Sequence, residues 1–248
     1  MNRTQYVIFE ATTECQMAEV HRACPIRDAR RARRWTGRAP LEDAEIIEAA
    51  VALYREHGFR GLVGWHYYGE PALAEDRISG LIDGISARVS EARYTLWTNG
   101  LAGSARWLGR FVQVIVTDYG LPDERLAEIR PAAPMAIVRP ARFDARRNPP
   151  GVPRTWSPCS RMFAEMIFDY YGVVHACCYD WAGEIDLGAL PDDPLGRIVE
   201  RWHALRAALG SHRLRPETPE ICRRCAWRSP NMPRLWPLPQ AAMETVPC

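Results

Sequence analysis

Residues 61–71 read GLVGWHYYGEP, an apolar run of strand type that ends in the turn sequence GEP. A second such run, RYTLWTNG at 93–100, ends in the turn sequence TNG. Residues 72–91 between them have the apolar spacing of a helix. A strand, a helix and a further strand predict a βαβ unit, with parallel strands and a right-handed crossover.

The same alternation extends along the first 140 residues. Further runs of strand type lie at 5–10 (QYVIFE), 112–117 and 135–138, and further helical patterns at 41–57, 103–108 and 123–130. Five strands that alternate with helices predict an α/β fold with a parallel sheet.

The pattern changes after a Pro- and Arg-rich bridge at 139–157. Residues 167–176 and 185–187 are predicted to pair as a β-hairpin, and 193–209 form an amphipathic helix. We therefore expect a boundary near residue 150. The expected units are a barrel-type domain at 1–150, a small Cys-rich domain at 151–228 and a Pro-rich tail at 229–248.

Composition excludes several classes of function. The 248 residues carry a net charge of +2 and no Lys, which gives no reason to expect a nucleic-acid or anionic-membrane partner. No segment approaches the roughly 20 apolar residues of a transmembrane helix, and the N-terminus lacks a signal-peptide layout. The eight Cys therefore indicate metal ligands or reactive thiols in a reducing cytoplasm.

Four cysteines in the C-terminal third have the spacing of a metal centre. Cys159 and Cys177 are separated by 17 residues, 44 more precede Cys222, and Cys222-x2-Cys225 closes the set. Thiolates select zinc or iron–sulfur clusters. A structural zinc site and an iron–sulfur site are both compatible with this spacing. The neighbouring Cys178 is an alternative to Cys177 as a ligand, although the Gly-x4-Cys spacing favours Cys177.

Polar sequences follow successive predicted strands in the first half of the chain. They are the loop with Cys15 and Cys24, then Gly69-Glu70-Pro71, Thr98-Asn99-Gly100 and Thr117-Asp118. Because the carboxyl ends of parallel strands meet at one edge, these loops are expected to converge on one site. Asp144 and Asp180 are expected to be solvated.

These motifs resemble those of the radical S-adenosylmethionine (SAM) enzymes. FEATTEC at 9–15 is similar to the entry of that family's cluster loop, YGEP at 68–71 to its SAM-binding motif, and TNG at 98–100 to the end of its third strand. The resemblance covers about residues 5–140 and implies a partial (β/α)6 TIM-like barrel. It implies SAM as a cofactor, held by residues at the strand ends: Gly69, Glu70, Pro71, Thr98, Asn99 and Thr117.

The C-terminal part resembles the SPASM/twitch extension of the same family. In the short twitch form, Cys159, Cys177, Cys222 and Cys225 would hold an auxiliary 4Fe-4S cluster. The total would then be one or two clusters, depending on the N-terminal loop.

The N-terminal cluster loop departs from the family pattern. The usual C-x3-C-x2-C is here C-x5-H-x2-C, formed by Cys15, His21 and Cys24. His21 is either the third ligand of an atypical cluster, since imidazole can bind cluster iron, or an ordinary loop histidine beside an absent or weak cluster.

The resemblance implies an oxidoreductase. A 5′-deoxyadenosyl radical would start a two-electron dehydrogenation of an alcohol on a small polar substrate, such as an aminocyclitol or sugar. Arg142 would contact the substrate hydroxyl, and flavodoxin or ferredoxin would donate electrons. The alternatives are a catalytically degenerate accessory protein, a peptide-modifying maturase and a zinc-stabilised α/β binding module.

Overall fold

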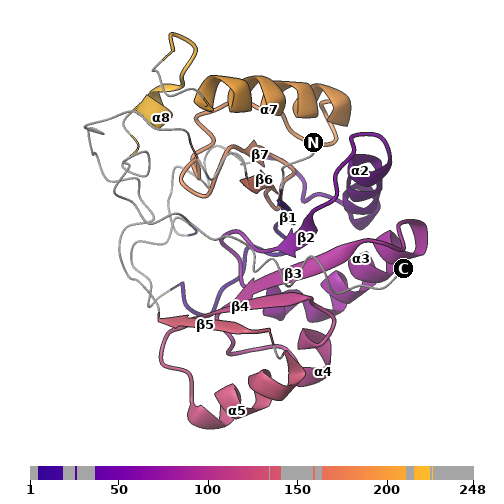
Figure 1. Cartoon of the computed structure of the whole chain (residues 1–248), viewed down its shortest axis with the longest axis vertical. Coiled ribbons are helices and arrows are strands. Elements are labelled where there is room, and N and C mark those ends of the chain that lie inside the picture. The colour runs from indigo at the N-terminus through magenta and orange to yellow at the C-terminus, as the bar shows by residue number, and fades with distance from the viewer. Residues whose placement is uncertain are drawn as a thin grey trace.

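The computed structural model describes residues 5–18, 26, 37–133, 135–140, 159, 164–210, 215–223 and 225. Its strands form one seven-stranded sheet in the order β5-β4-β3-β2-β1-β6-β7 (Figure 1). The strands are β1 (Tyr6–Phe9), β2 (Leu62–Trp65), β3 (Arg93–Thr98), β4 (Gln113–Asp118), β5 (Ile137–Pro140), β6 (Glu165–Phe168) and β7 (Val174–His175). Strands β1 to β6 pair in parallel and β7 is antiparallel to β6. The predicted α/β class with a parallel sheet is confirmed.

Helices follow the strands along the chain. They are α2 (Asp43–Arg55), the 3-10 helix η2 (Pro71–Ala74), α3 (Glu75–Arg88), α4 (Ala105–Leu108), α5 (Asp123–Ala132), α7 (Leu195–Leu209) and α8 (Glu220–Arg223). Helices α2 to α5 lie along one side of the sheet, while α7 lies near β6 and β7 (Figure 1). Nearly all of the predicted helices and strands of the first 140 residues are found within a few residues of their expected bounds.

The two faces of the sheet have separate cores because strand side chains alternate. Val7 and Phe9 of β1 join the larger core against the helices. Tyr6 and Ile8 join a smaller core on the opposite face, with Ile167 of β6.

Helix α2 shows how the sequence fixes an element. It begins with a capping box, in which Glu42 and Glu45 each accept a hydrogen bond from the other's backbone N–H. The Glu42 amide lies 2.8 Å from the Glu45 carboxylate. The buried side of α2 includes Ile46, Ala50 and Leu53, whose spacing of four and then three residues follows the helical period.

The predicted hairpin was wrong in its second strand. The hairpin forms inside the first of the two runs, between β6 and β7, and residues 185–187 are not in a strand. The turn depends on Asp169, whose Oδ1 accepts hydrogen bonds from the backbone N–H groups of Tyr171 and Val173, each at 2.9 Å. Gly172 completes the turn with a φ of +78°.

Strand β6 lies next to β1, so residues on both sides of position 150 share one sheet. This pairing places the segment that follows β6 beside the loop that follows β1. The Pro-rich tail at 229–248 lies outside the described residues. Among the described helices, none has the length and apolar character needed to cross a membrane.

Candidate functional site

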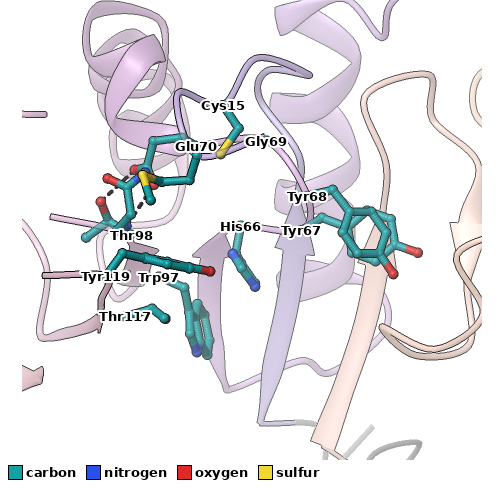
Figure 2. A pocket seen from close by; sticks show the side chains of 12 residues that line it. Cys15, His66, Tyr67, Tyr68, Gly69, Glu70, Trp97, Thr98, Thr117 and Tyr119 are labelled. Atoms are coloured by element: carbon teal, nitrogen blue, oxygen red, sulfur yellow. Dashed lines mark hydrogen bonds between the residues drawn. The ribbon is translucent and has the colours of Figure 1, made fainter. Parts of the chain in front are cut away.

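A pocket opens at the carboxyl ends of strands β1 to β4 (Figure 2). This is the edge at which parallel α/β folds bind ligands. The lining residues are Cys15, Met17, His66, Tyr67, Tyr68, Gly69, Glu70, Trp97, Thr98, Asn99, Thr117 and Tyr119. The expectation that the strand-end loops converge on one site is confirmed.

Six of the residues predicted to bind a cluster or SAM line this pocket: Cys15, Gly69, Glu70, Thr98, Asn99 and Thr117. Pro71 is buried beside them at the start of η2. Three other predicted residues, His21, Cys24 and Arg142, lie outside the described part of the chain. The individual roles of all of these residues stay predictions.

Gly69 is required by a close approach of two loops. A Cβ atom at this position would lie 1.7 Å from the carbonyl oxygen of Thr12. The adjacent Glu70 N–H donates to the Glu14 carbonyl at 2.7 Å. The loop after β2 therefore packs directly on the loop that carries Cys15.

Glu70 fastens the loop after β2 to the end of β3. Its carboxylate accepts hydrogen bonds from the Thr98 hydroxyl at 2.5 Å and from the Asn99 N–H at 2.7 Å. It also accepts from the Ala72 N–H at 3.0 Å. Burial raises the pKa of Glu70, and these three hydrogen bonds oppose the rise.

Asn99 offers a hydrogen-bond donor at the pocket. Its Oδ1 accepts from the Leu101 N–H at 3.0 Å and from Gln16 Nε2 at 3.4 Å. Its Nδ2 is buried without a hydrogen-bond partner among the described residues. Because an unpaired buried donor is costly, this atom fits a pocket that binds a ligand with an acceptor.

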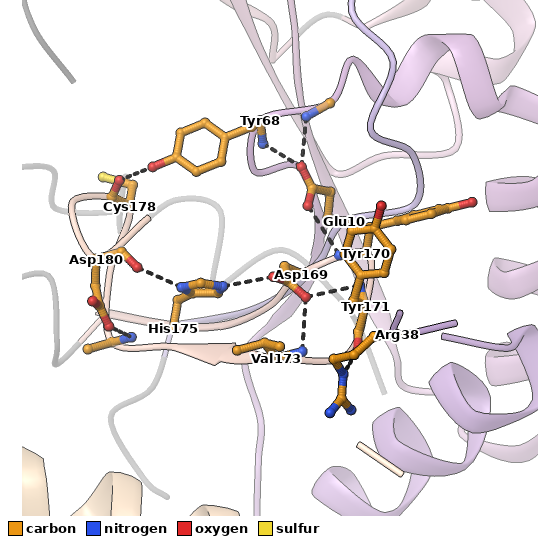
Figure 3. Close-up of polar contacts among 12 residues, drawn as sticks. Glu10, Arg38, Tyr68, Asp169, Tyr170, Tyr171, Val173, His175, Cys178 and Asp180 are labelled. Atoms are coloured by element: carbon orange, nitrogen blue, oxygen red, sulfur yellow. Dashed lines mark hydrogen bonds and ion pairs between the residues drawn. The ribbon is translucent and has the colours of Figure 1, made fainter. Parts of the chain in front are cut away.

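Sequence reasoning missed Glu10, which joins three loops (Figure 3). Its Oε1 accepts from the N–H groups of Tyr68 and Gly69, at 3.0 Å and 2.9 Å. Its Oε2 accepts from the Tyr170 N–H at 3.1 Å. A carboxylate directly after an apolar strand was the available signal, but its partners lie 58 to 160 residues away.

A buried hydrogen-bond network starts at Asp169, next to Tyr170, and extends toward the C-terminal cysteines (Figure 3). Asp169 Oδ2 lies 2.9 Å from His175 Nε2, and His175 Nδ1 lies 2.6 Å from the Asp180 carbonyl. Burial lowers the pKa of His175, but Asp169 and Asp180 outweigh it and raise the pKa above its usual value. Burial raises the pKa of Asp180 to about 6, against the opposing charge of His175.

The expectation that Asp180 is solvated was wrong, because its side chain is buried. Asp180 ends the loop that begins at Cys177: its N–H donates to the Cys177 carbonyl at 3.0 Å. Its Oδ1 accepts from the Glu184 N–H at 2.7 Å. These hydrogen bonds compensate for burial of the carboxylate. Asp144 lies outside the described residues.

Tyr68 connects the pocket to the cysteine loop. Its side chain lies between the two, and its hydroxyl donates a hydrogen bond to the carbonyl of Cys178 (Figure 3). Tyr68 also lines the pocket, and Cys178 packs against the same small core. One side chain therefore spans from the pocket wall to the residue after Cys177.

The predicted cluster ligands are gathered at the C-terminal end of the described chain. Cys159 lies at the end of α7, where its N–H donates to the Leu209 carbonyl at 3.2 Å. Burial raises the pKa of the Cys177 thiol, and the neighbouring thiols of Cys178, Cys159 and Cys222 raise it further. The Cys225 N–H donates to the Cys222 carbonyl at 3.4 Å. Cys177, Cys159 and Cys222 are therefore close enough to interact electrostatically.

The chemistry of the four predicted ligands suits a soft metal centre, because thiolates select zinc or iron–sulfur clusters. Among the described residues, no group of three or more His, Cys, Asp or Glu side chains is placed to hold one metal ion.

Residues 159–226 match the SPASM family, an iron–sulfur cluster-binding domain. No curated protein sequence matches the chain at a significant level. The structure is similar to BtrN in complex with AdoMet and 2-DOIA, with a TM-score of 0.64, 15% sequence identity, and coverage of 90% of this chain and 93% of BtrN. It is also similar to BtrN in an open conformation, with a TM-score of 0.61, 16% identity, and coverage of 90% and 92%.

The match and the structural similarity bear on different parts of the prediction. The SPASM match contains all four cysteines that were predicted to hold the auxiliary cluster. The similarity to BtrN spans most of both chains, and at this level of identity it establishes the fold. The chain thus has the fold seen in BtrN, and its residues 159–226 match the SPASM iron–sulfur cluster-binding domain family.

Proposed function

We propose that this protein is a radical SAM iron–sulfur oxidoreductase that removes two electrons from an alcohol on a small polar substrate. The observation that carries the proposal is the link from the pocket to the cysteine loop, through the Tyr68 hydroxyl and the Cys178 carbonyl. The similar BtrN structure was determined with AdoMet and 2-DOIA, which supports SAM and a small polyhydroxylated substrate here.

The residues around the pocket fit SAM. Asn99 Nδ2, which has no hydrogen-bond partner among the described residues, would donate to the SAM carboxylate or ribose, and the loop containing Gly69 and Glu70 would receive the SAM amino group. Cys15 would bind the N-terminal cluster together with Cys24 and His21, and an electron donor such as flavodoxin or ferredoxin would reduce it. When bound, this cluster and SAM supply the 5′-deoxyadenosyl radical that removes a hydrogen atom from a substrate carbon.

The protein's own residues would complete the oxidation. The alcohol carbon loses one hydrogen atom, the hydroxyl loses a proton, and one electron must leave for the carbonyl to form. Arg142 would orient the hydroxyl and favour loss of its proton. Cys159, Cys177, Cys222 and Cys225 would hold an auxiliary cluster with one thiolate for each iron, which would suit it to accept that electron rather than to bind substrate.

Anaerobic reconstitution tests the proposal directly. Protein reconstituted with iron and sulfide, then given SAM and dithionite, is expected to produce 5′-deoxyadenosine, which is measured by liquid chromatography. The Cys15→Ala variant should lose this product because the N-terminal cluster loses a ligand.

Cys178→Ala is the matched control, because the Gly-x4-Cys spacing favours Cys177 over Cys178 as the ligand and the Cys178 backbone carbonyl is retained. It should form 5′-deoxyadenosine at a rate within about twofold of wild type. Product no higher than in a protein-free blank for reconstituted wild type would refute the proposed activity.

A further inference from the structure

Trp97 lies at the floor of the pocket, on the face of the sheet opposite the helices (Figure 2). Its indole meets the Tyr6 ring edge-on, with centroids 5.1 Å apart and an interplanar angle of 75°. On another side the His66 ring stacks on it at 5.6 Å and 26°. The side chain nevertheless stays partly exposed toward the pocket.

The absence of a side chain at Gly64 makes room for this ring. A Cβ at Gly64 would lie 2.9 Å from Trp97 Cζ3 and 3.1 Å from Ile8 Cγ1. The indole therefore crosses the backbone of β2, where an alanine would displace it. Because close-packed surroundings fix a side chain in one orientation, Gly64, Tyr6 and His66 together hold a rigid aromatic surface beneath the pocket.

The groups around this surface are polar and mostly neutral. Thr117 near the end of β4 and Tyr119 directly after β4 contribute hydroxyl groups, and His66 contributes a ring nitrogen. Among the described lining residues, Glu70 is the only Asp or Glu and none is Arg, and the Glu70 side chain already accepts three hydrogen bonds. Ligand pockets of this kind combine an apolar surface with a few polar groups that fix orientation.

We propose that the Trp97 indole is the platform on which a saturated, hydroxylated ring stacks, with Tyr119 binding a hydroxyl group at the ring's edge. The face of an aromatic ring is negative, and C–H bonds next to hydroxyl groups are polarised positive, so one face of such a ring is attracted to the indole. An extended peptide offers no comparable flat C–H face. This inference rests on the proposed function, because it assigns the substrate class of the same pocket.

Binding of simple ring probes tests the platform without turnover. Isothermal titration calorimetry of the SAM-loaded protein with D-glucosamine and with myo-inositol is expected to show binding of at least one of them. Trp97→Ala should weaken that binding about tenfold or more, because aromatic contacts contribute on the order of 1 kcal/mol beyond buried area. Gly64→Ala should weaken it as well, by displacing the indole.

Trp107→Ala is the control, since Trp107 is a buried residue of α4 and does not line the pocket. This variant tests whether the loss of any indole weakens ring binding. Ring binding should be unchanged, and circular dichroism checks that the variant is folded. Trp97→Phe, which keeps a smaller ring, should lie between wild type and Trp97→Ala.

The outcomes separate this inference from the proposed function. Ring binding that Trp97→Ala leaves unchanged, or binding of a tripeptide with no binding of either ring probe, would overturn the platform. The platform is also overturned if none of the probes binds. Ring binding that depends on Trp97, in a protein that forms no 5′-deoxyadenosine, would retain the platform and reject the proposed reaction.

Discussion

Replacing Gly69 with alanine is expected to abolish SAM cleavage and to destabilise the fold. The new Cβ would lie 1.7 Å from the Thr12 carbonyl oxygen and 2.6 Å from the Thr12 carbonyl carbon. Both are backbone atoms, so relief requires the loop after β1 to move away from the loop after β2. That movement would separate Cys15 from the pocket and would break the Glu70–Glu14 backbone hydrogen bond of 2.7 Å.

We expect 5′-deoxyadenosine formation by Gly69→Ala to fall at least a hundredfold, and the free energy of unfolding to fall by about 1–3 kcal/mol. Urea unfolding of the apoprotein measures the second effect independently of any cofactor. The two readouts show whether the loss of activity exceeds the loss of folded protein.

Gly80→Ala provides the matched control. Gly80 lies on the exposed side of α3, and a Cβ there would meet nothing within 4 Å. Alanine in a helix interior is favoured over glycine by up to about 1 kcal/mol, so this variant should be as active as wild type and slightly more stable. A Gly69→Ala protein that behaves like Gly80→Ala would contradict the assigned contact between the two loops.

Removing the Asp169 carboxylate is the second change with a large expected effect. Asp169 and His175 are both fully buried, and their side chains lie 2.9 Å apart. The same carboxylate holds the β6–β7 turn through the N–H groups of Tyr171 and Val173. Asp169→Ala removes the acceptor of these part-buried N–H groups and the partner of the fully buried His175, and breaking a buried pair of this kind costs about 3–5 kcal/mol.

We also expect Asp169→Ala to lower the occupancy of the auxiliary cluster. His175 lies two residues before Cys177 and contacts the Asp180 carbonyl at 2.6 Å, so it orders the loop that presents Cys177. Urea unfolding measures the loss of stability, and iron analysis of reconstituted protein measures the loss of the cluster.

Asp192→Ala controls for the removal of a carboxylate. The Asp192 side chain is 66% exposed and forms a 2.8 Å ion pair with Arg38. Exposed pairs contribute about 0–1 kcal/mol, so stability and iron content should change little. If Asp169→Ala and Asp192→Ala had equal effects, the buried network would not order the cysteine loop.

The parallel strands of the first 140 residues could be predicted because each is a short apolar run followed by a turn sequence. The pocket followed from the same reasoning: Thr98 ends β3, Glu70 lies in the loop after β2, and parallel strands bring their carboxyl ends together. The spacing of Cys159, Cys177, Cys222 and Cys225 identified a domain that the SPASM match confirms.

The features that could not be predicted from the sequence depend on contacts between segments that are far apart in the chain. The pairing of β6 with β1 joins residues about 160 positions apart, and no local pattern specifies it. Glu10, Asp169 and Asp180 were missed as a buried network because a single carboxylate carries no sign of its partners. The position of Trp97 likewise depends on Gly64, on a neighbouring strand, which the sequence presents only as an interrupted apolar run.

The most direct test of the whole account is the iron and sulfide content of anaerobically reconstituted protein, in wild type and in a Cys159→Ala/Cys222→Ala double variant. Two 4Fe-4S clusters predict about eight irons in wild type and about four in the variant. Cys178→Ala should retain the wild-type value.

Wild type with about four irons that fall to none in the double variant would contradict the proposed reaction, because only the auxiliary cluster would then exist. The accessory-protein alternative would then be favoured. Zinc without iron in wild type would instead favour the zinc-stabilised module. Eight irons falling to four is the result that the proposed function requires.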